Sequence, residues 1–173
     1  MSRPPFPEPS AEDVRIVTLQ LGRPARDVVG IAARCVCGAP TVVSTRPRLT
    51  DGTPFPTFYY LTHPAAVAAV STLEAEGRMP LYAQQLSGDT ARQYQVAHEQ
   101  YLADREQYGA VAEIAGISAG GMPERVKCLH ALVGHALAAG PGVNPIGDLA
   151  LQEAEWSPLR CECPDYAQPE EAS

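Results

Sequence analysis

The architecture depends most on one stretch of the chain, ERVKCLHALVGHALAAGPGVNPIGD at residues 124–148, which has the pattern of a helix covered on most sides. From Cys128 to Gly147 it contains no Lys, Arg, Asp or Glu. At about 100° per residue its large apolar residues share one face, and small residues opposite let another backbone approach closely. We therefore predict a central buried helix over residues 123–139. Its apolar face consists of Leu129, Leu132, Val133 and Ala136.

Upstream of this helix the sequence predicts a small antiparallel sheet. VVGIAARCV and TVVSTRP are short β-rich runs, CGAP between them is a hairpin signal, and TFYYLT predicts a third strand. From residue 62 onward helical patterns dominate, beginning with Pro64 at an early helical position. The expected fold is therefore α+β, with a small antiparallel sheet at about residues 27–61 followed by a helix-rich half.

Two further helices have recognisable starts. Ser10 is a plausible cap for a first helix that runs to about Leu21. Asp89 opens a long amphipathic helix in which tyrosines recur every seven residues, and we expect these aromatic rings to pack on the body of the protein. The tyrosines are Tyr94, Tyr101 and Tyr108.

Length and charge limit the domain organisation and the class of partner. A chain of 173 residues favours one domain, which we place at residues 10–156, between a disordered segment 1–9 and a mobile acidic tail 157–173. The net charge of −7 argues against binding nucleic acid. No run of about 18 apolar residues is present, so no membrane span is expected. The Pro-rich start lacks an apolar signal core, which argues for a cytoplasmic protein.

The cysteines favour metal binding over disulfides. Their number is five, which is odd, in a chain without an export signal. Two pairs share one spacing, RCVCG with Cys35 and Cys37, and RCECP with Cys161 and Cys163. Together they would make a four-thiolate zinc site joining the two ends of the chain, although the spacing is less specific than C-x-x-C. The alternative is that these cysteines are only small apolar side chains.

A second ligand set comes from the buried helix. Its imidazoles need partners, because burial of an unpaired polar group costs free energy, and either hydrogen bonds or a metal would supply them. Cys128 and His135 lie on one flank of the helix, about 10.5 Å apart along its axis. One metal ion reaches both only if the first helical turn is distorted or His135 extends fully. An iron–sulfur cluster is wider and would relax that demand. His130 points elsewhere. The best distant ligands are Cys35, at a strand end, and His63, at a helix entry.

The loop before the buried helix suggests an anion site. Gly120 and Gly121 can present backbone N–H groups, and the helix that follows presents its positive end. Arg125 and Lys127 would add positive charge. The pattern matches no known phosphate loop, so it predicts only a small anionic ligand.

Two motifs resemble a known family. RCVCGAPTVVSTRPRLTDGTPFPTFYYLTHP together with RVKCLHALVGHALAAGPGVNPIGD is similar to the bacterial family called domain of unknown function five-hundred-and-one, over roughly residues 19–155. Many members carry cysteine where this chain has His63, an exchange that a zinc site tolerates, whereas Cys37 matches no cysteine of the family. The resemblance implies a site made by Cys35, His63, Cys128 and either His130 or His135.

The expected function is that of a small cytoplasmic zinc protein, a binding or regulatory module whose partner is an unknown protein or a small anionic ligand. Two alternatives remain open. One is an enzyme, in which Cys128 is a nucleophile activated by Lys127 and a histidine, or in which the metal keeps an open position. The other is a redox protein with an iron–sulfur cluster.

Overall fold

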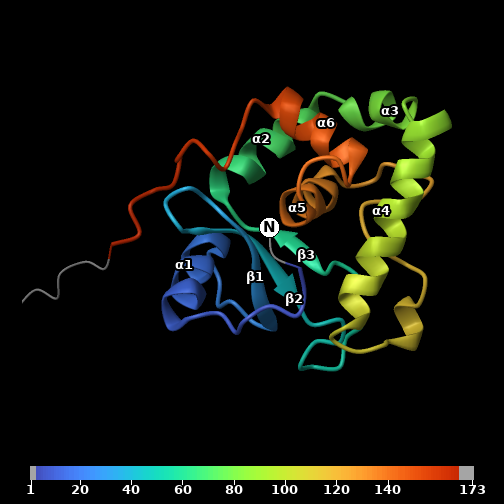
Figure 1. Ribbon diagram of the computed structural model, residues 1–173. Coiled ribbons are helices and arrows are strands. Elements are labelled where there is room, and N and C mark those ends of the chain that lie inside the picture. The colour runs from blue at the N-terminus through green and yellow to red at the C-terminus, as the bar shows by residue number, and fades with distance from the viewer. Residues whose placement is uncertain (1–2, 168–173) are drawn as a thin grey trace, which may run out of the picture.

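The computed structural model describes residues 3–167, and their fold is α+β, as predicted. A three-stranded sheet comes first and helices follow it (Figure 1). In chain order the elements are α1 (Ala11–Leu21), β1 (Val28–Arg34), β2 (Pro40–Thr45), β3 (Tyr59–Leu61), α2 (Pro64–Ala75), α3 (Arg78–Ala83), α4 (Gly88–Glu106), a 3-10 turn at Ala112–Ile114, α5 (Leu129–Ala139) and α6 (Pro145–Ala154).

The sheet is antiparallel with the order β1-β2-β3. The predicted pairing of the first two strands is confirmed, with Ile31 opposite Val43, and β3 pairs on the other side with Tyr60 opposite Val43. All six residues of β2 are buried, and both α1 and α5 contact this strand. The central strand is therefore covered on both faces, which explains why the residues of TVVST are buried on both sides instead of alternating between core and solvent.

Helix α5 lies at the centre of the protein, as predicted, and packs against β3, α2 and α6 (Figure 1). A Cβ placed on Gly134 would lie 3.1 Å from the carbonyl oxygen of Tyr59, so the small residue allows the backbone of β3 to approach closely. The four residues predicted to form the apolar face are all inaccessible, namely Leu129, Leu132, Val133 and Ala136.

The predicted start of this helix at residue 123 was wrong, because α5 begins at Leu129. The preceding backbone folds on itself instead of continuing the helix. The N–H of Arg125 donates to the carbonyl of Gly121 at 2.8 Å, and the N–H of Lys127 donates to the carbonyl of Gly120 at 2.7 Å. Both glycines have positive φ, which a helix does not accommodate.

Helix α4 packs its tyrosines on the body of the protein, as predicted. Tyr94 and Tyr101 are fully buried, and Tyr108, which lies beyond the end of the helix at Glu106 instead of within it as predicted, packs against the same core. The hydroxyl of Tyr101 accepts the N–H of Phe58 at 2.6 Å, which fixes the start of β3 against α4. Ser87, rather than the expected Asp89, occupies the N-cap position.

Both terminal segments contact the domain within the described residues. Phe6, placed by sequence in a disordered segment, is buried, and its N–H donates to the hydroxyl of Tyr108 at 2.7 Å. The predicted mobile tail begins at residue 157, and residues 157–167 run beside the hairpin of β1 and β2 (Figure 1). Residues 1–2 and 168–173 of these two segments lie outside the described residues. Among residues 3–167, no helix combines the length and apolarity needed to cross a membrane.

Candidate metal centre

Four cysteines from the two ends of the chain converge at the β1–β2 hairpin. Cys35 follows β1, Cys37 lies in the hairpin turn, and Cys161 and Cys163 belong to the segment after α6. Their four sulfur atoms all lie within 4.8 Å of one another. The sulfurs of Cys37 and Cys163 are 3.4 Å apart, which is well beyond the roughly 2.05 Å of a disulfide bond.

Backbone hydrogen bonds shape the hairpin turn that carries two of these thiols. The N–H of Cys35 donates to the carbonyl of Ala39 at 2.8 Å, and the N–H of Gly38 donates to the carbonyl of Cys35 at 2.8 Å. Gly38 has a φ of 92°, a conformation that residues with a Cβ rarely adopt. The CVCGA sequence therefore forms a tight loop with Cys35 and Cys37 on it.

The C-terminal segment is attached to the same hairpin. The N–H of Val36 donates to the carbonyl of Pro158 at 2.8 Å. The ring of buried Trp156 lies 5.0 Å from the ring of His63, measured between centroids. Further along, the guanidinium of Arg15 on α1 donates to the carbonyl of Tyr166. These contacts on both sides of residues 161–163 hold the second thiol pair against the first.

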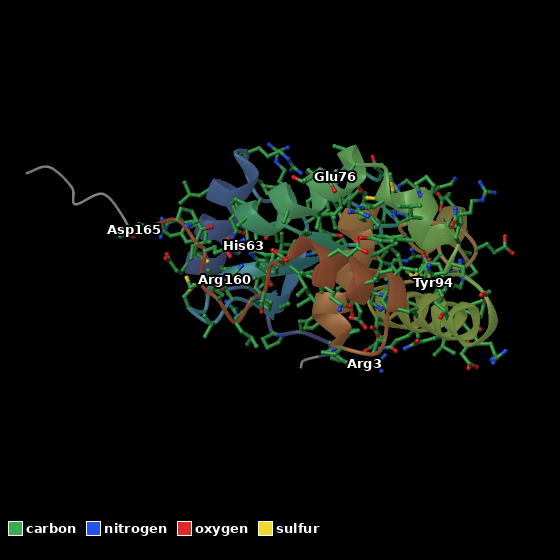
Figure 2. The ribbon with its side chains drawn as sticks, turned by 90° about the horizontal axis from the view of Figure 1, so that it is seen from above. Arg3, His63, Glu76, Tyr94, Arg160 and Asp165 are labelled. Carbon is green, nitrogen blue, oxygen red and sulfur yellow. The ribbon has the colours of Figure 1, made fainter. Side chains whose placement is uncertain are left out.

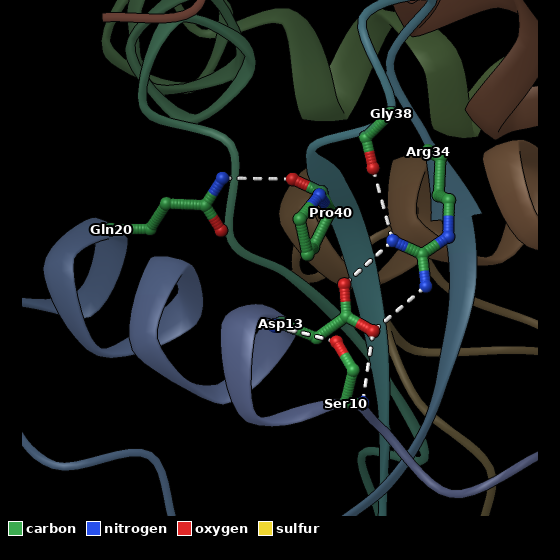
Figure 3. A network of polar contacts seen from close by, with 6 residues as sticks. All are labelled: Ser10, Asp13, Gln20, Arg34, Gly38 and Pro40. Atoms are coloured by element: carbon green, nitrogen blue, oxygen red, sulfur yellow. Dashed lines mark hydrogen bonds and ion pairs between the residues drawn. The ribbon is translucent and has the colours of Figure 1, made fainter. Parts of the chain in front are cut away.

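Helix α1 braces the hairpin from the other side, as Figure 3 shows. Arg34 donates to both carboxylate oxygens of Asp13, at 2.7 and 2.9 Å, and also to the carbonyl of Gly38 at 3.0 Å. The hydrogen bond from Arg34 holds the pKa of Asp13 below its usual range. Asp13 in turn completes a capping box with Ser10, which confirms the predicted N-cap. Arg34 is thus paired with a carboxylate.

His63 lies beside the thiols without joining their group. It is fully buried, and its Nε2 is 3.2 Å from the sulfur of Cys163. Its Nδ1 accepts the N–H of Ala66 at the start of α2, so the ring proton belongs on Nε2 and donates toward the sulfur. Such hydrogen bonds from a neighbouring residue orient metal ligands and tune their charge. Figure 2 shows His63 and Arg160 toward the end of the molecule where the C-terminal segment lies, away from Tyr94.

The thiols differ in acidity because their surroundings differ. The backbone hydrogen bond from Ala39 is the main reason that the pKa of Cys37 falls to about 7. Burial raises the pKa of Cys35 and, more strongly, that of Cys163. Four sulfurs this close do not all ionise without a cation among them, and a bound metal deprotonates coordinating thiols.

The donor set suits a single tetrahedral metal ion. Sulfurs at about 2.3 Å from a shared zinc lie roughly 3.8 Å from one another, and the arrangement here is of that size. An iron–sulfur cluster requires a wider cage, with sulfurs about 6 Å apart. Four thiolates also leave no open coordination position, which is typical of structural rather than catalytic zinc.

The ligands predicted from sequence are divided among three places. Cys35 belongs to the four-thiol group, and His63 contacts a member of that group. Cys128 and His130 form a second group with Glu74, and His135 belongs to neither. Within residues 3–167 the single site expected from Cys35, His63, Cys128 and a helix histidine is therefore not assembled. The reason is topological, because Cys128 caps α5 beside the end of α2, whereas Cys35 lies at the hairpin turn.

The second group connects α2 to the start of α5. Glu74 Oε1 accepts the N–H of Leu129 at 2.8 Å and lies 3.2 Å from Nδ1 of His130. The hydrogen bond from His130 lowers the pKa of Cys128, and the same contact raises the pKa of His130. Cys128 and His130 line a cavity of about 650 Å³, whose other walls come from α1, β3 and α2.

His135 is a histidine of the core. It is fully buried, with its ring stacked at 5.6 Å on Tyr59 and edge-on at 5.1 Å to Tyr101. The side-chain amide of Asn144 lies 3.2 Å from its Nδ1. Burial lowers the pKa of His135 to about 4, so the ring is neutral at physiological pH. At Nδ1 this is the hydrogen-bonding alternative that the sequence left open, whereas Nε2 is buried with no hydrogen-bond partner among the described residues.

The predicted anion loop uses its polar groups internally. The N–H groups of Arg125, Lys127 and Cys128 donate to carbonyls of Gly121 and Gly120. The first N–H of α5 is bound by the carboxylate of Glu74 rather than left for a ligand. These contacts engage the carbonyls of Gly120 and Gly121 rather than their N–H groups, so the anion site, the anionic ligand and the protein partner remain predictions.

Sequence reasoning underrated Cys37, Cys161 and Cys163 and missed Glu74. The repeated RC-x-C spacing was the available signal for the cysteines, and the family resemblance weakened it because it does not include Cys37. No local pattern distinguishes Glu74 from the neighbouring acidic residues of LEAEG.

Comparison with known proteins gives a family but no activity. No curated protein and no solved structure matches the chain. One family model, described as Protein of unknown function (DUF501), matches residues 31–152, a span that includes Cys35, Cys37 and the second group but ends before Cys161. Because this match covers well over half of the chain, the protein belongs to the DUF501 family.

Proposed function

We propose that the chain is a zinc-binding module in which Cys35, Cys37, Cys161 and Cys163 hold one structural zinc ion. The observation that carries the proposal is the convergence of four sulfurs, from both ends of the chain, to within 4.8 Å of one another. Neutral thiols gain little from such crowding, whereas four thiolates around one divalent cation form a stable tetrahedral site. The short 3.4 Å separation of Cys37 and Cys163 favours a mononuclear ion over a cluster.

The zinc would join the C-terminal segment to the hairpin. Without it, residues 157–167 contact the domain mainly through single hydrogen bonds such as Val36 to Pro158. Because the four ligands are not assembled in the unfolded chain, the free energy of zinc binding stabilises the folded state. His63, buried under Trp156, would donate to the zinc-bound sulfur of Cys163 and hold it in place.

The test is metal analysis of protein purified without oxygen, together with thermal unfolding. We expect about one zinc per chain and a lower melting temperature in the presence of a strong chelator. Cobalt(II) exchanged into the site should give thiolate-to-metal charge-transfer absorption. A brown protein containing iron and sulfide would contradict the proposal of zinc.

Single cysteine variants locate the site. Cys37→Ser and Cys163→Ser should both lose most of the bound zinc. Cys128→Ser is the matched control, since it removes one thiol outside the group, and it should keep the metal. Normal zinc content in Cys37→Ser and Cys163→Ser would show that these thiols do not hold it.

A further inference from the structure

The group formed by Cys128, His130 and Glu74 has the parts of a nucleophilic site, and the zinc proposal does not use it. Cys128 occupies the N-cap of α5, where the helix favours negative charge on a thiol. His130 is the second residue of the same helix, and one of its ring nitrogens is within 4.8 Å of the sulfur of Cys128. Both side chains are partly exposed to solvent, so a small molecule can reach them.

The partners of His130 favour its charged form. Nδ1 faces Glu74 Oε1 at 3.2 Å, and Nε2 faces the hydroxyl oxygen of Ser71 at 3.1 Å. The carboxylate of Glu74 accepts the N–H of Nδ1, whereas the hydroxyl of Ser71 accepts from a protonated Nε2 or donates to a neutral one, so Nε2 can release its proton and keep its partner. Glu74 is itself held in place by the N–H of Leu129 at 2.8 Å. The chain therefore brings a thiol, an imidazole and a carboxylate that orients the imidazole to within 4.8 Å of one another, and these are groups that thiol enzymes use.

The same contacts argue against a metal at this group. A metal at His130 would have to displace either the Glu74 oxygen from Nδ1 or the Ser71 hydroxyl from Nε2. Glu74 Oε1, the oxygen nearest the ring, already accepts a backbone hydrogen bond.

The adjoining cavity indicates the class of substrate. Its volume is about 650 Å³, and Cys128, His130 and Ala131 form one wall. The remaining walls come from α2, β3 and the end of α1, with no Lys, Arg, Asp or Glu among the lining residues. The charge of His130 is offset by Glu74 and the Cys128 thiolate, so the cavity offers no unpaired cation to a phosphate or carboxylate. It suits an uncharged molecule with a short apolar chain.

We propose that Cys128 is a catalytic nucleophile for uncharged esters of short apolar acyl groups, with His130 as the proton donor and Glu74 as its positioning residue. The thiolate of Cys128 attacks the carbonyl carbon, forming an S–C bond, while the C–O bond to the leaving alcohol breaks. The leaving oxygen takes the proton of His130. Neutral His130 then removes a proton from water, which attacks the thioester, releasing the carboxylic acid and restoring the thiolate–imidazolium pair.

The main test uses 4-nitrophenyl butyrate with the zinc-loaded, full-length protein. We expect a burst of about one nitrophenolate per chain and a mass increase of one butyryl group on the peptide containing Cys128. Iodoacetamide should also alkylate Cys128 in the folded protein several-fold faster at neutral pH than in the unfolded chain, where a free thiol is only a few per cent thiolate. Absence of both modifications from Cys128 in the wild-type protein would overturn the proposal, without depending on any variant.

Variants separate the roles of the three residues. Cys128→Ser should abolish the burst, and His130→Asn should slow it by at least tenfold. Glu74→Gln keeps an acceptor for Leu129 but removes the charge that faces His130, so the pH midpoint of the His130 ring resonances in an NMR titration should fall. The titratable groups at the His130 ring are Glu74 from α2 and Cys128 at the start of α5, and Tyr59 and Tyr60 from β3 line the adjoining cavity. An unchanged midpoint would leave Glu74 with only a structural role.

Metal stoichiometry provides a further test that is separate from the zinc proposal. If the protein holds two metal ions per chain and Cys128→Ser loses one of them, the second group is a metal site and the nucleophile proposal is overturned. Loss of zinc from Cys37→Ser, by contrast, bears only on the four-thiol centre.

Discussion

The buried imidazole of His135 should make the stability of the protein depend on pH. Its ring is fully inaccessible, lies between Tyr59 and Tyr101, and has the amide of Asn144 at Nδ1. Burial, the largest influence, lowers its pKa from 6.5 to about 4, and the charge of Arg3 acts in the same direction. At a pH between these two pKa values, His135 is protonated in the unfolded chain but neutral in the folded chain. Stability contributed by the neutral ring is therefore complete above about pH 6.5 and is lost as the pH falls toward 4.

The size of the effect follows from the two pKa values. Each unit of difference between the folded-state and unfolded-state pKa values corresponds to about 1.4 kcal/mol of unfolding free energy. The pKa of His135 is about 4 in the folded state and 6.5 in the unfolded state. With these values, lowering the pH from about 7.5 to about 5 should reduce the free energy of unfolding by about 2 kcal/mol. Most of the loss should occur between about pH 6.5 and 5.

The assay is urea unfolding of the wild-type protein and His135→Gln at both pH values. The variant keeps a side-chain oxygen near Asn144 but has no group that titrates in this range. His63 and His98, whose pKa values are lowered by burial, and His130, whose pKa is raised by its contact with Cys128, contribute to both proteins. Proton-driven release of zinc also affects both. These contributions cancel when the pH dependence of the variant is subtracted from that of the wild type.

The difference between the two pH dependences should be about 2 kcal/mol, with the wild type losing more stability on acidification. A difference below about 0.5 kcal/mol would refute the reasoning, because it would mean that His135 takes up its proton equally well in the folded state. A difference of the opposite sign would mean that the ring is charged in the core.

Two predictions test the packing of α5 by urea unfolding. Leu132→Ala should lower the free energy of unfolding by about 2–5 kcal/mol, because the side chain is fully buried; Leu159→Ala, at a residue 82% exposed, should change it by less than about 0.5 kcal/mol. Equal effects of the two would contradict the buried face of α5. Gly147→Ala should cost about 1–3 kcal/mol, since its Cβ would lie 2.3 Å from the carbonyl oxygen of Leu132 and force α6 away from α5. An Ala variant as stable as the wild type would show that this close crossing of the two helices is absent.

Local patterns in the sequence were enough for the main elements of the fold. The helix cap at Ser10, the hairpin signal CGAP and the seven-residue repeat of the tyrosines each depend on residues that are close in the chain, and the structure contains the elements they predict. The apolar face of α5 was also correct in every residue. The start of that helix was not, because the turn at Gly120 and Gly121 depends on backbone conformations that the apolar spacing does not reveal.

The family resemblance was likewise available from sequence, since its motifs are long and continuous, and the family match over residues 31–152 confirms it. It misdirected the choice of ligands, however. It drew attention to Cys35, His63 and Cys128, whereas the four-thiol group takes two members from beyond the matched span.

The sequence by itself determined which residues were able to ligate a metal or act as nucleophiles, because that ability is a property of thiols, imidazoles and carboxylates. Only the tertiary structure decided how they are grouped. Cys37 and Cys163 are 126 residues apart in the chain and meet because residues 157–167 return to the hairpin. Glu74 and His130 meet because α2 packs beside α5. Periodicity and capping act over a few residues, whereas contacts between distant segments follow from how the whole core packs.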